Sequence, residues 1–216
     1  MLPFYIYYSM FGFQRVGDAA WQAGDMRARG FMLGGTAGRT TLNGEGLQHE
    51  DGQSQTQAGL IPNVRSYDPT FAYEVVTIVQ HGMQRMLAEQ RDEYWYLTLM
   101  NENYTHPEMP EGSAEGIIKG MYLLKDAGKA KKGELRVQLL GSGTILREVI
   151  AAAELLDADF GIKADLWSCP SFTELARDGV DAERWNRLLP DAPSPRVPWV
   201  TQQLQDRRGP KIDAND

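Results

Sequence analysis

Apolar residues in the first hundred positions alternate between short continuous runs and longer stretches with helical spacing. The runs at 4–10, 31–33 and 94–100 are typical of buried strands, and the first is expected to be buried on both faces. Between them, apolar residues recur every three or four positions from about 13 to 23 and from about 70 to 89. This alternation of strands and helices predicts an α/β fold with a mostly parallel sheet and helices on its faces.

Residues 101–111 contain two prolines and are followed by Gly112, which predicts a domain boundary between 110 and 111. The alternation then resumes, so that 111–204 is expected to form a second α/β unit. The tail 205–216 is charged and has no apolar periodicity, and we expect it to be disordered. The elements predicted for the second unit are a helix at 114–125, a strand at 135–140, a helix after Thr144, a strand at 164–169 and a further helix from Ser171.

Two short motifs predict where helices begin. Asp68-Pro69 combines an N-cap residue with proline at the first helical position. Ser171 and Glu174 have the spacing of a capping box, in which each side chain bonds the backbone N–H of the other residue.

The segment 34–52 contains six glycines and therefore does not suit a regular helix or a central strand. It ends in the polar cluster Gln48-His49-Glu50-Asp51 and lies between apolar segments. Long loops in compact domains are usually functional or disordered, and the apolar flanks favour a functional loop. His49 could donate a hydrogen bond to a developing negative charge, or it could simply bond its own loop; the spacing leaves both open.

Composition narrows the classes of partner. The formal net charge is -7 and the pI is near 5.1, which argues against nucleic acid as the main partner. No run reaches the apolar length needed to span a bilayer, so no membrane partner is expected. The single cysteine, Cys169, fits a reducing compartment, and we expect the cytoplasm.

Two other chemistries fit the sequence poorly. Gly141-Ser142-Gly143 lies between a strand and a helix, but a dinucleotide fingerprint needs a third glycine where this chain has Leu146, so a tight turn is the better interpretation. The histidines at 49, 81 and 106 are scattered, and no metal site is predicted. We expect His81 and His106 to have structural or surface roles, and Cys169 to be a buried small hydrophobe.

Six further motifs occur in order along the chain: YYSMFGFQR at 7–15, GGTAGRTTLNGEGLQHEDG at 34–52, SYDP at 66–69, NENY at 101–104, LLGSG at 139–143 and SFTELARDG at 171–179. Together they resemble the homodimeric bacterial type of pyruvate dehydrogenase first component, from about Phe4 to Gln205. This family is thiamine-diphosphate-dependent, decarboxylating and acetyl-transferring.

The resemblance implies parts of two transketolase-like domains. Residues 1–110 would be the second half of the middle, pyrimidine-binding domain, and 111–204 the start of the transketolase C-terminal-like domain. Tyr8 and Phe11 would line the aminopyrimidine pocket as cofactor-binding residues. His49 would be an active-site histidine on the substrate side, and Glu45 a loop-ordering carboxylate of the same catalytic motif.

By the same resemblance the cofactors are thiamine diphosphate and Mg²⁺, and the substrate is pyruvate. The thiazolium carbanion would attack the keto carbon, carbon dioxide would leave, and the acetyl unit would pass to the lipoyl domain of the dihydrolipoyl acyltransferase component. Full-length members form homodimers. The activating glutamate and the diphosphate and metal ligands lie upstream of Met1 in the family, so we expect a partial chain that is inactive in isolation. The alternative is a catalytically inactive fragment that only pairs with a complementary chain or partner.

Overall fold

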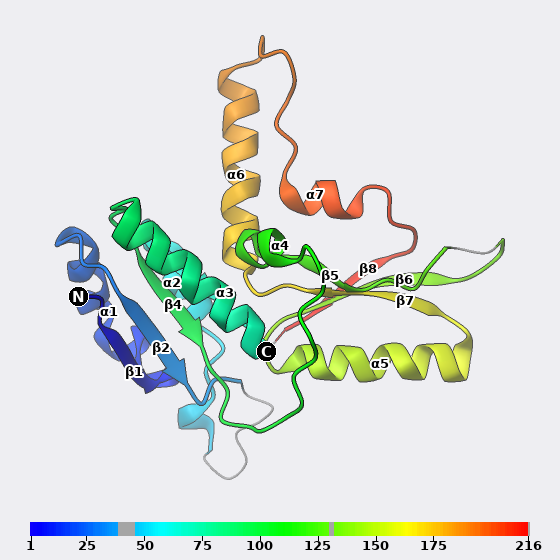
Figure 1. The fold of residues 1–216 in the computed structure, drawn as a ribbon, viewed down its shortest axis with the longest axis horizontal. Helices are drawn as coiled ribbons and strands as arrows, with labels where there is room; N and C mark the ends of the chain where they lie inside the picture. The colour runs from blue at the N-terminus through cyan, green and yellow to red at the C-terminus, as the bar shows by residue number, and fades with distance from the viewer. Residues whose placement is uncertain (39–45, 130–131, 216) are drawn as a thin grey trace.

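The computed structural model describes residues 1–38, 46–129 and 132–215. Within them, one sheet contains β1 (Phe4–Tyr8), β2 (Phe31–Gly35), β4 (Tyr94–Thr98) and β3 (Val64–Tyr67), in that spatial order. Every pairing in it is parallel, as the alternating pattern predicted (Figure 1). In this order β1 pairs with β2 and β3 pairs with β4, while β4 also pairs with β2 in the centre of the sheet.

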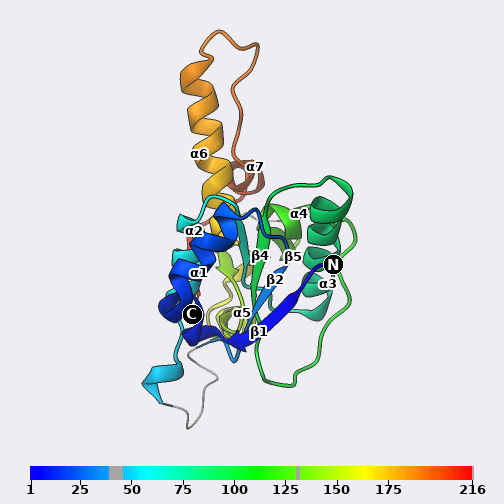
Figure 2. The same ribbon diagram turned by 90° about the vertical axis from the view of Figure 1, so that its left-hand side faces the viewer.

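Helices cover both faces of this first sheet (Figure 2). The helices α1 (Phe13–Asp25) and α2 (Ser54–Leu60) pack on one face against Tyr94 and Tyr96. On the other face, α3 (Ala72–Met83) and the π-helical turn η4 (Gln84–Ala88) pack against alternate residues of the same strands. The fully buried β4 explains why its sequence is a continuous apolar run rather than an alternating one.

The second sheet has the order β5-β7-β6-β8 within the described residues. Its strands are β5 (Tyr122–Lys125), β6 (Arg136–Gly141), β7 (Lys163–Ser168) and β8 (Lys211–Ala214). The β5–β7 pairing is antiparallel and the others are parallel. Its helices are α4 (Ala114–Lys119), α5 (Ile145–Phe160), α6 (Phe172–Leu188) and α7 (Trp199–Leu204). In Figure 1, α5 lies along the sheet, whereas α6 projects away from both sheets.

The structure corrects the expectation for β1. The strand pairs with β2, and no described residue pairs with its other edge, so it lies at the border of the sheet rather than inside it. Tyr5 and Ile6 are 62% and 67% exposed, and the side chains of Phe4 and Tyr8 are about half exposed. The apolar run at 4–10 therefore predicted a strand correctly, but the expectation that this strand is buried on both faces was wrong.

Three further segments differ from their sequence-based expectations. The helix predicted to reach 125 ends at Lys119, because Gly120 adopts a left-handed conformation (φ 93°) and the chain turns into β5. The tail predicted to be disordered contains β8, which pairs with β6. The helix α2 had no predicted counterpart. The linker that follows β4 contains the predicted domain boundary, which remains a prediction.

The start of α3 is also corrected. Asp68 was expected to cap this helix, but the helix begins at Ala72, and the backbone N–H groups of Thr70 and Phe71 both donate to the Glu74 carboxylate. By contrast, the capping box of α6 forms as predicted on one side: the Ser171 hydroxyl accepts from the Glu174 N–H at 3.0 Å.

Candidate functional site

The carboxyl ends of the first sheet's strands meet at one edge because all of them are parallel. β1 ends at Tyr8 and passes directly into the 3-10 turn η1 (Ser9–Phe11). At the same edge β2 leads into the glycine-rich segment, which returns as the 3-10 turn η3 (Leu47–His49). This edge therefore brings together two segments that are about forty residues apart in the chain.

Tyr8, Phe11 and His49 form an aromatic group at this edge, and we call it the ring cluster. The His49 imidazole lies 5.4 Å from the Tyr8 ring and 5.0 Å from the Phe11 ring, centroid to centroid. Tyr8 and Phe11 are 6.1 Å apart in an edge-on arrangement. Tyr8 is half exposed. The structure thus brings three of the nominated residues together; the fourth, Glu45, lies outside the described residues.

The close packing beneath the ring cluster explains one glycine of the family-like motif. Gly34 lies in β2 opposite Tyr7 of β1. A Cβ on Gly34 would lie 2.5 Å from the Tyr96 hydroxyl and 2.9 Å from Ser9 Cβ. Any side chain there would displace the turn that carries Phe11, so the position requires glycine.

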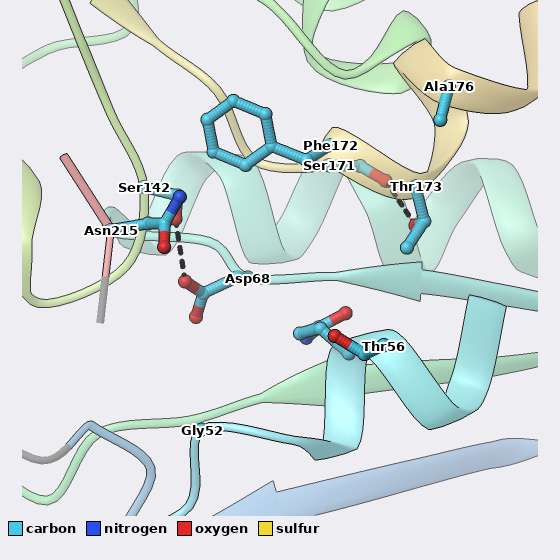
Figure 3. A pocket seen from close by; sticks show the side chains of 10 residues that line it. Gly52, Thr56, Asp68, Ser142, Ser171, Phe172, Thr173, Ala176 and Asn215 are labelled. Atoms are coloured by element: carbon cyan, nitrogen blue, oxygen red, sulfur yellow. Dashed lines mark hydrogen bonds between the residues drawn. The ribbon is translucent and has the colours of Figure 1, made fainter. Parts of the chain in front are cut away.

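A cavity of about 380 Å³ lies between the carboxyl ends of the two sheets, and no residue of the ring cluster is among its lining residues (Figure 3). Asp68 projects into it after β3. Its carboxylate accepts hydrogen bonds from the Ser142 hydroxyl at 2.8 Å and from the Thr98 hydroxyl at 2.5 Å. The cavity is lined by Gly52, Gln55, Thr56, Asp68, Ser142, Ser171, Phe172, Thr173, Ala176 and Asn215.

The glycine-containing turn after β6 serves this contact between the sheets. Gly143 has φ 49°, and its N–H donates to the Asp68 carbonyl at 3.1 Å. A Cβ on Gly143 would lie 2.4 Å from an Asp68 carboxylate oxygen. The tight-turn interpretation fits this geometry. Sequence reasoning missed Asp68 as a link between the sheets, because the Asp-Pro pair also matches a helix start.

The other reactive side chains have structural surroundings. The His81 ring lies edge-on to Trp95 at 5.7 Å, and burial lowers the pKa of the imidazole. His106 Nδ1 accepts from the Ala72 N–H at 3.2 Å. Cys169 is buried, and burial raises the pKa of its thiol, which disfavours the reactive thiolate.

No group of three or more histidine, cysteine, aspartate or glutamate side chains in 1–38, 46–129 and 132–215 is placed to hold a metal ion. No helix in the described part of the chain is long and apolar enough to cross a membrane.

Comparison with known proteins assigns both halves of the chain. Residues 1–107 match the family model of the pyruvate dehydrogenase E1 component middle domain, and residues 120–213 match that of the transketolase-like C-terminal domain. Relatives described as "Pyruvate dehydrogenase E1 component" are 62% identical in Pseudomonas aeruginosa and in Cupriavidus necator, and 57% identical in Escherichia coli K12. Each alignment covers 100% of this chain and 24% of the relative, so the chain spans about a quarter of their length.

Solved structures support the fold assignment. Transketolase from Leishmania mexicana matches with a TM-score of 0.70 at 15% identity, over 100% of this chain and 27% of that one. Transketolase from Campylobacter jejuni matches with a TM-score of 0.68 at 19% identity, over 100% of this chain and 28% of that one. The fold is therefore transketolase-like in both sheets. Together with the sequence identity along its whole length, this shows that the chain belongs to the pyruvate dehydrogenase E1 component family and corresponds to a part of the longer relatives.

Proposed function

We propose that this chain contributes one wall of a thiamine diphosphate site in a pyruvate dehydrogenase. The observation that carries the proposal is the convergence of Tyr8, Phe11 and His49 at the carboxyl edge of a parallel sheet, the usual ligand-binding edge in α/β proteins. The two aromatic side chains suit a planar heteroaromatic ring such as an aminopyrimidine, since they can offer it apolar faces.

The ring cluster fits only the ring portion of the cofactor. Its side chains are aromatic, whereas a diphosphate and Mg²⁺ require oxygen ligands and positive charge. Those ligands belong to parts of the enzyme outside this chain, which spans 24% of the length of its relative in Pseudomonas aeruginosa. The isolated chain is accordingly inactive, and Glu45 keeps its proposed role in ordering the loop.

In the complete site, Tyr8 and Phe11 hold and orient the aminopyrimidine ring. When bound, thiamine diphosphate supplies the carbanion needed to decarboxylate a 2-oxo acid, here pyruvate. His49 lies against both rings and is partly exposed, so its imidazole can orient the substrate and can act as a general acid or base toward it. The two-carbon unit then passes as acetyl to the lipoyl domain of an acyltransferase partner, whose disulfide takes up the two electrons and opens to a thiol and an acetyl thioester. The working assembly is a cytoplasmic homodimer of the full-length protein.

The cofactor part of the proposal is tested on the purified chain. Because only one wall of the site is present, titration calorimetry should detect weak or no binding of thiamine diphosphate with Mg²⁺. A tight, Mg²⁺-dependent site on the chain by itself would contradict this division of the ligands.

The role of His49 is tested in a full-length relative, such as the 57% identical Escherichia coli protein, at the aligned histidine. Replacement by alanine should leave cofactor affinity nearly unchanged and lower the rate of the complete reaction by about a hundredfold, the scale of losing one acid–base group. A histidine that only orders its loop predicts weaker binding or a raised KM with little change in kcat.

Replacement of the same histidine by glutamine separates hydrogen bonding from proton transfer. Glutamine can donate a hydrogen bond but cannot carry the proton. If the glutamine variant keeps full acetyl transfer to lipoamide, the proton-transfer role is wrong.

A further inference from the structure

The ring cluster is assembled from two segments that are held together behind the rings. Tyr8 and Phe11 flank Ser9 in the turn η1, whereas His49 ends the turn η3. Polar side chains immediately behind the cluster join the two segments.

Gln14, in the first turn of α1, provides the central link. Its side-chain Nε2 donates to Asp51 Oδ1 at 3.0 Å and to Ser54 Oγ at 3.1 Å. The Ser54 hydroxyl in turn donates to the Ser9 carbonyl at 3.2 Å. The chain of contacts thus runs from the turn that carries Phe11 to the segment that follows His49.

Asp51 anchors the other end of this network. Its Oδ1 also accepts from the backbone N–H groups of Gln53 at 3.1 Å and of Ser54 at 3.0 Å, which fixes the start of α2. Asp51 is 8% exposed and Ser54 is 2% exposed. A carboxylate that accepts three hydrogen bonds away from water makes strong, directional contacts, because the bonds are charge-assisted and the surroundings have a low dielectric.

We infer that Gln14 and Asp51 are positioning residues, which hold the His49 imidazole against the rings of Tyr8 and Phe11. The positioning of His49 is a property of this chain by itself. Its importance for catalysis rests on the proposed function, which this inference deepens. Asp51 is two residues from His49, and Gln14 is three residues from Phe11. Loss of the Gln14 amide therefore removes the direct link between the start of α1 and Asp51, while the Ser54–Ser9 bond and the sheet beneath the rings are retained.

The inference is tested with Gln14→Met, which keeps the length of the side chain and removes both N–H donors. The readout is the NMR signal of the His49 Cε1 proton, which ring currents from Tyr8 and Phe11 displace in the unmodified chain. The chain has three histidines, so His49→Gln assigns this signal by its disappearance. Gln22→Met is the matched control, since Gln22 is an exposed residue of the same helix.

The expected result is that Gln14→Met reduces the displacement and moves the His49 signal toward the position of a solvated histidine, with the other two histidine signals and the amide spectrum retained. Gln22→Met leaves all three signals in place. Ser54→Ala, which removes the bond to the Ser9 carbonyl, should also reduce the displacement, and it decides the matter if Gln14→Met does not fold. An unchanged His49 signal in the folded variants overturns the inference. No cofactor or activity enters this measurement, so its failure is distinct from failure of the kinetic test of His49.

Discussion

The buried carboxylate of Glu74 links the two sheets, and its removal makes a sharp prediction. Glu74 is fully buried. Its Oε2 accepts from the backbone N–H groups of Thr70 and Phe71 at 2.6 and 3.0 Å. Its Oε1 accepts from the hydroxyls of Tyr122 and Ser168, both at 2.6 Å. The first pair lies before α3, and the second pair belongs to the second sheet, so one side chain joins both units.

Glu74→Ala should destabilise the chain by about 3 kcal/mol or more. Tyr122 would keep its hydroxyl contact with Tyr73 at 2.6 Å. The two backbone N–H groups and the Ser168 hydroxyl would lose their acceptor in the interior, and each unsatisfied buried group costs about 1–3 kcal/mol. Removal of a buried charge offsets part of this cost, and for that reason we take the lower end of the range for each group.

Glu74→Gln separates the charge from the hydrogen bonds. The amide oxygen can still accept from the two backbone N–H groups, and the NH₂ group can donate to hydroxyls that reverse their direction. Burial raises the pKa of the Glu74 carboxyl above its ordinary value of 4.5, although its donors act in the opposite direction. As the pH rises, Glu74 therefore loses its proton in the unfolded chain before it does so in the folded chain. Its contribution to the free energy of unfolding falls as the pH rises from 4.5 to the higher pKa of the folded state. The stability of Glu74→Gln relative to the unmodified chain should accordingly increase with pH across that window.

The assay is urea unfolding at a series of pH values, followed by tryptophan fluorescence. Trp95 and Trp167 are both buried, one in each sheet, so the signal reports on both units. Glu111→Gln, at an exposed position of the linker, is the control for a change of charge alone. A stability difference between Glu74→Gln and the unmodified chain that is the same at every pH would refute the reasoning, and so would a Glu74→Ala variant as stable as the control.

Three further predictions use the same unfolding assay. Gly143→Ala should destabilise by about 1 kcal/mol or more, because the new Cβ would meet the Asp68 carboxylate at a residue with positive φ; a neutral effect would show that the turn tolerates a side chain. Ser171→Ala should cost about 1–2 kcal/mol, because the hydroxyl both caps α6 and donates to the Ser66 carbonyl at 2.6 Å. Ser171→Thr, whose hydroxyl can make both hydrogen bonds, should recover part of this cost. Ile78→Ala should cost about 2–5 kcal/mol since this side chain is fully buried. Val76→Ala, at a 53% exposed position of the same helix, should cost much less. Equal losses of stability in the two variants would contradict the assignment of Ile78 to the buried face of α3.

Local pattern was sufficient for the elements whose side chains are buried. The continuous apolar run of β4, the helical spacing of α3 and the Ser171 cap of α6 each record a local environment that a few neighbouring residues determine. The family resemblance nominated Tyr8, Phe11 and His49 by their motifs. What it could not provide was their mutual arrangement.

Tertiary structure decided the elements whose stabilising partners are remote in sequence. β8 has little apolar content, and its Ile212 is 52% exposed; the strand forms because the backbone of β6 offers it hydrogen bonds. The exposure of β1 depends on its having a strand neighbour on one side within the described residues. An apolar run signals the tendency to form a strand, but its place in the sheet depends on which other strands pair with it.

The site depends on tertiary structure for the same reason. The sequence by itself determined which residue types could act: two aromatic rings, an imidazole and the polar groups around them. The strand order β1-β2-β4-β3 then decided that η1 and η3 meet at one edge, and the network through Gln14 and Asp51 joined them. Hydrogen bonds between residues 37 positions apart leave no periodic trace in the sequence, because each partner satisfies its own local geometry and the pairing exists only once the sheet has formed.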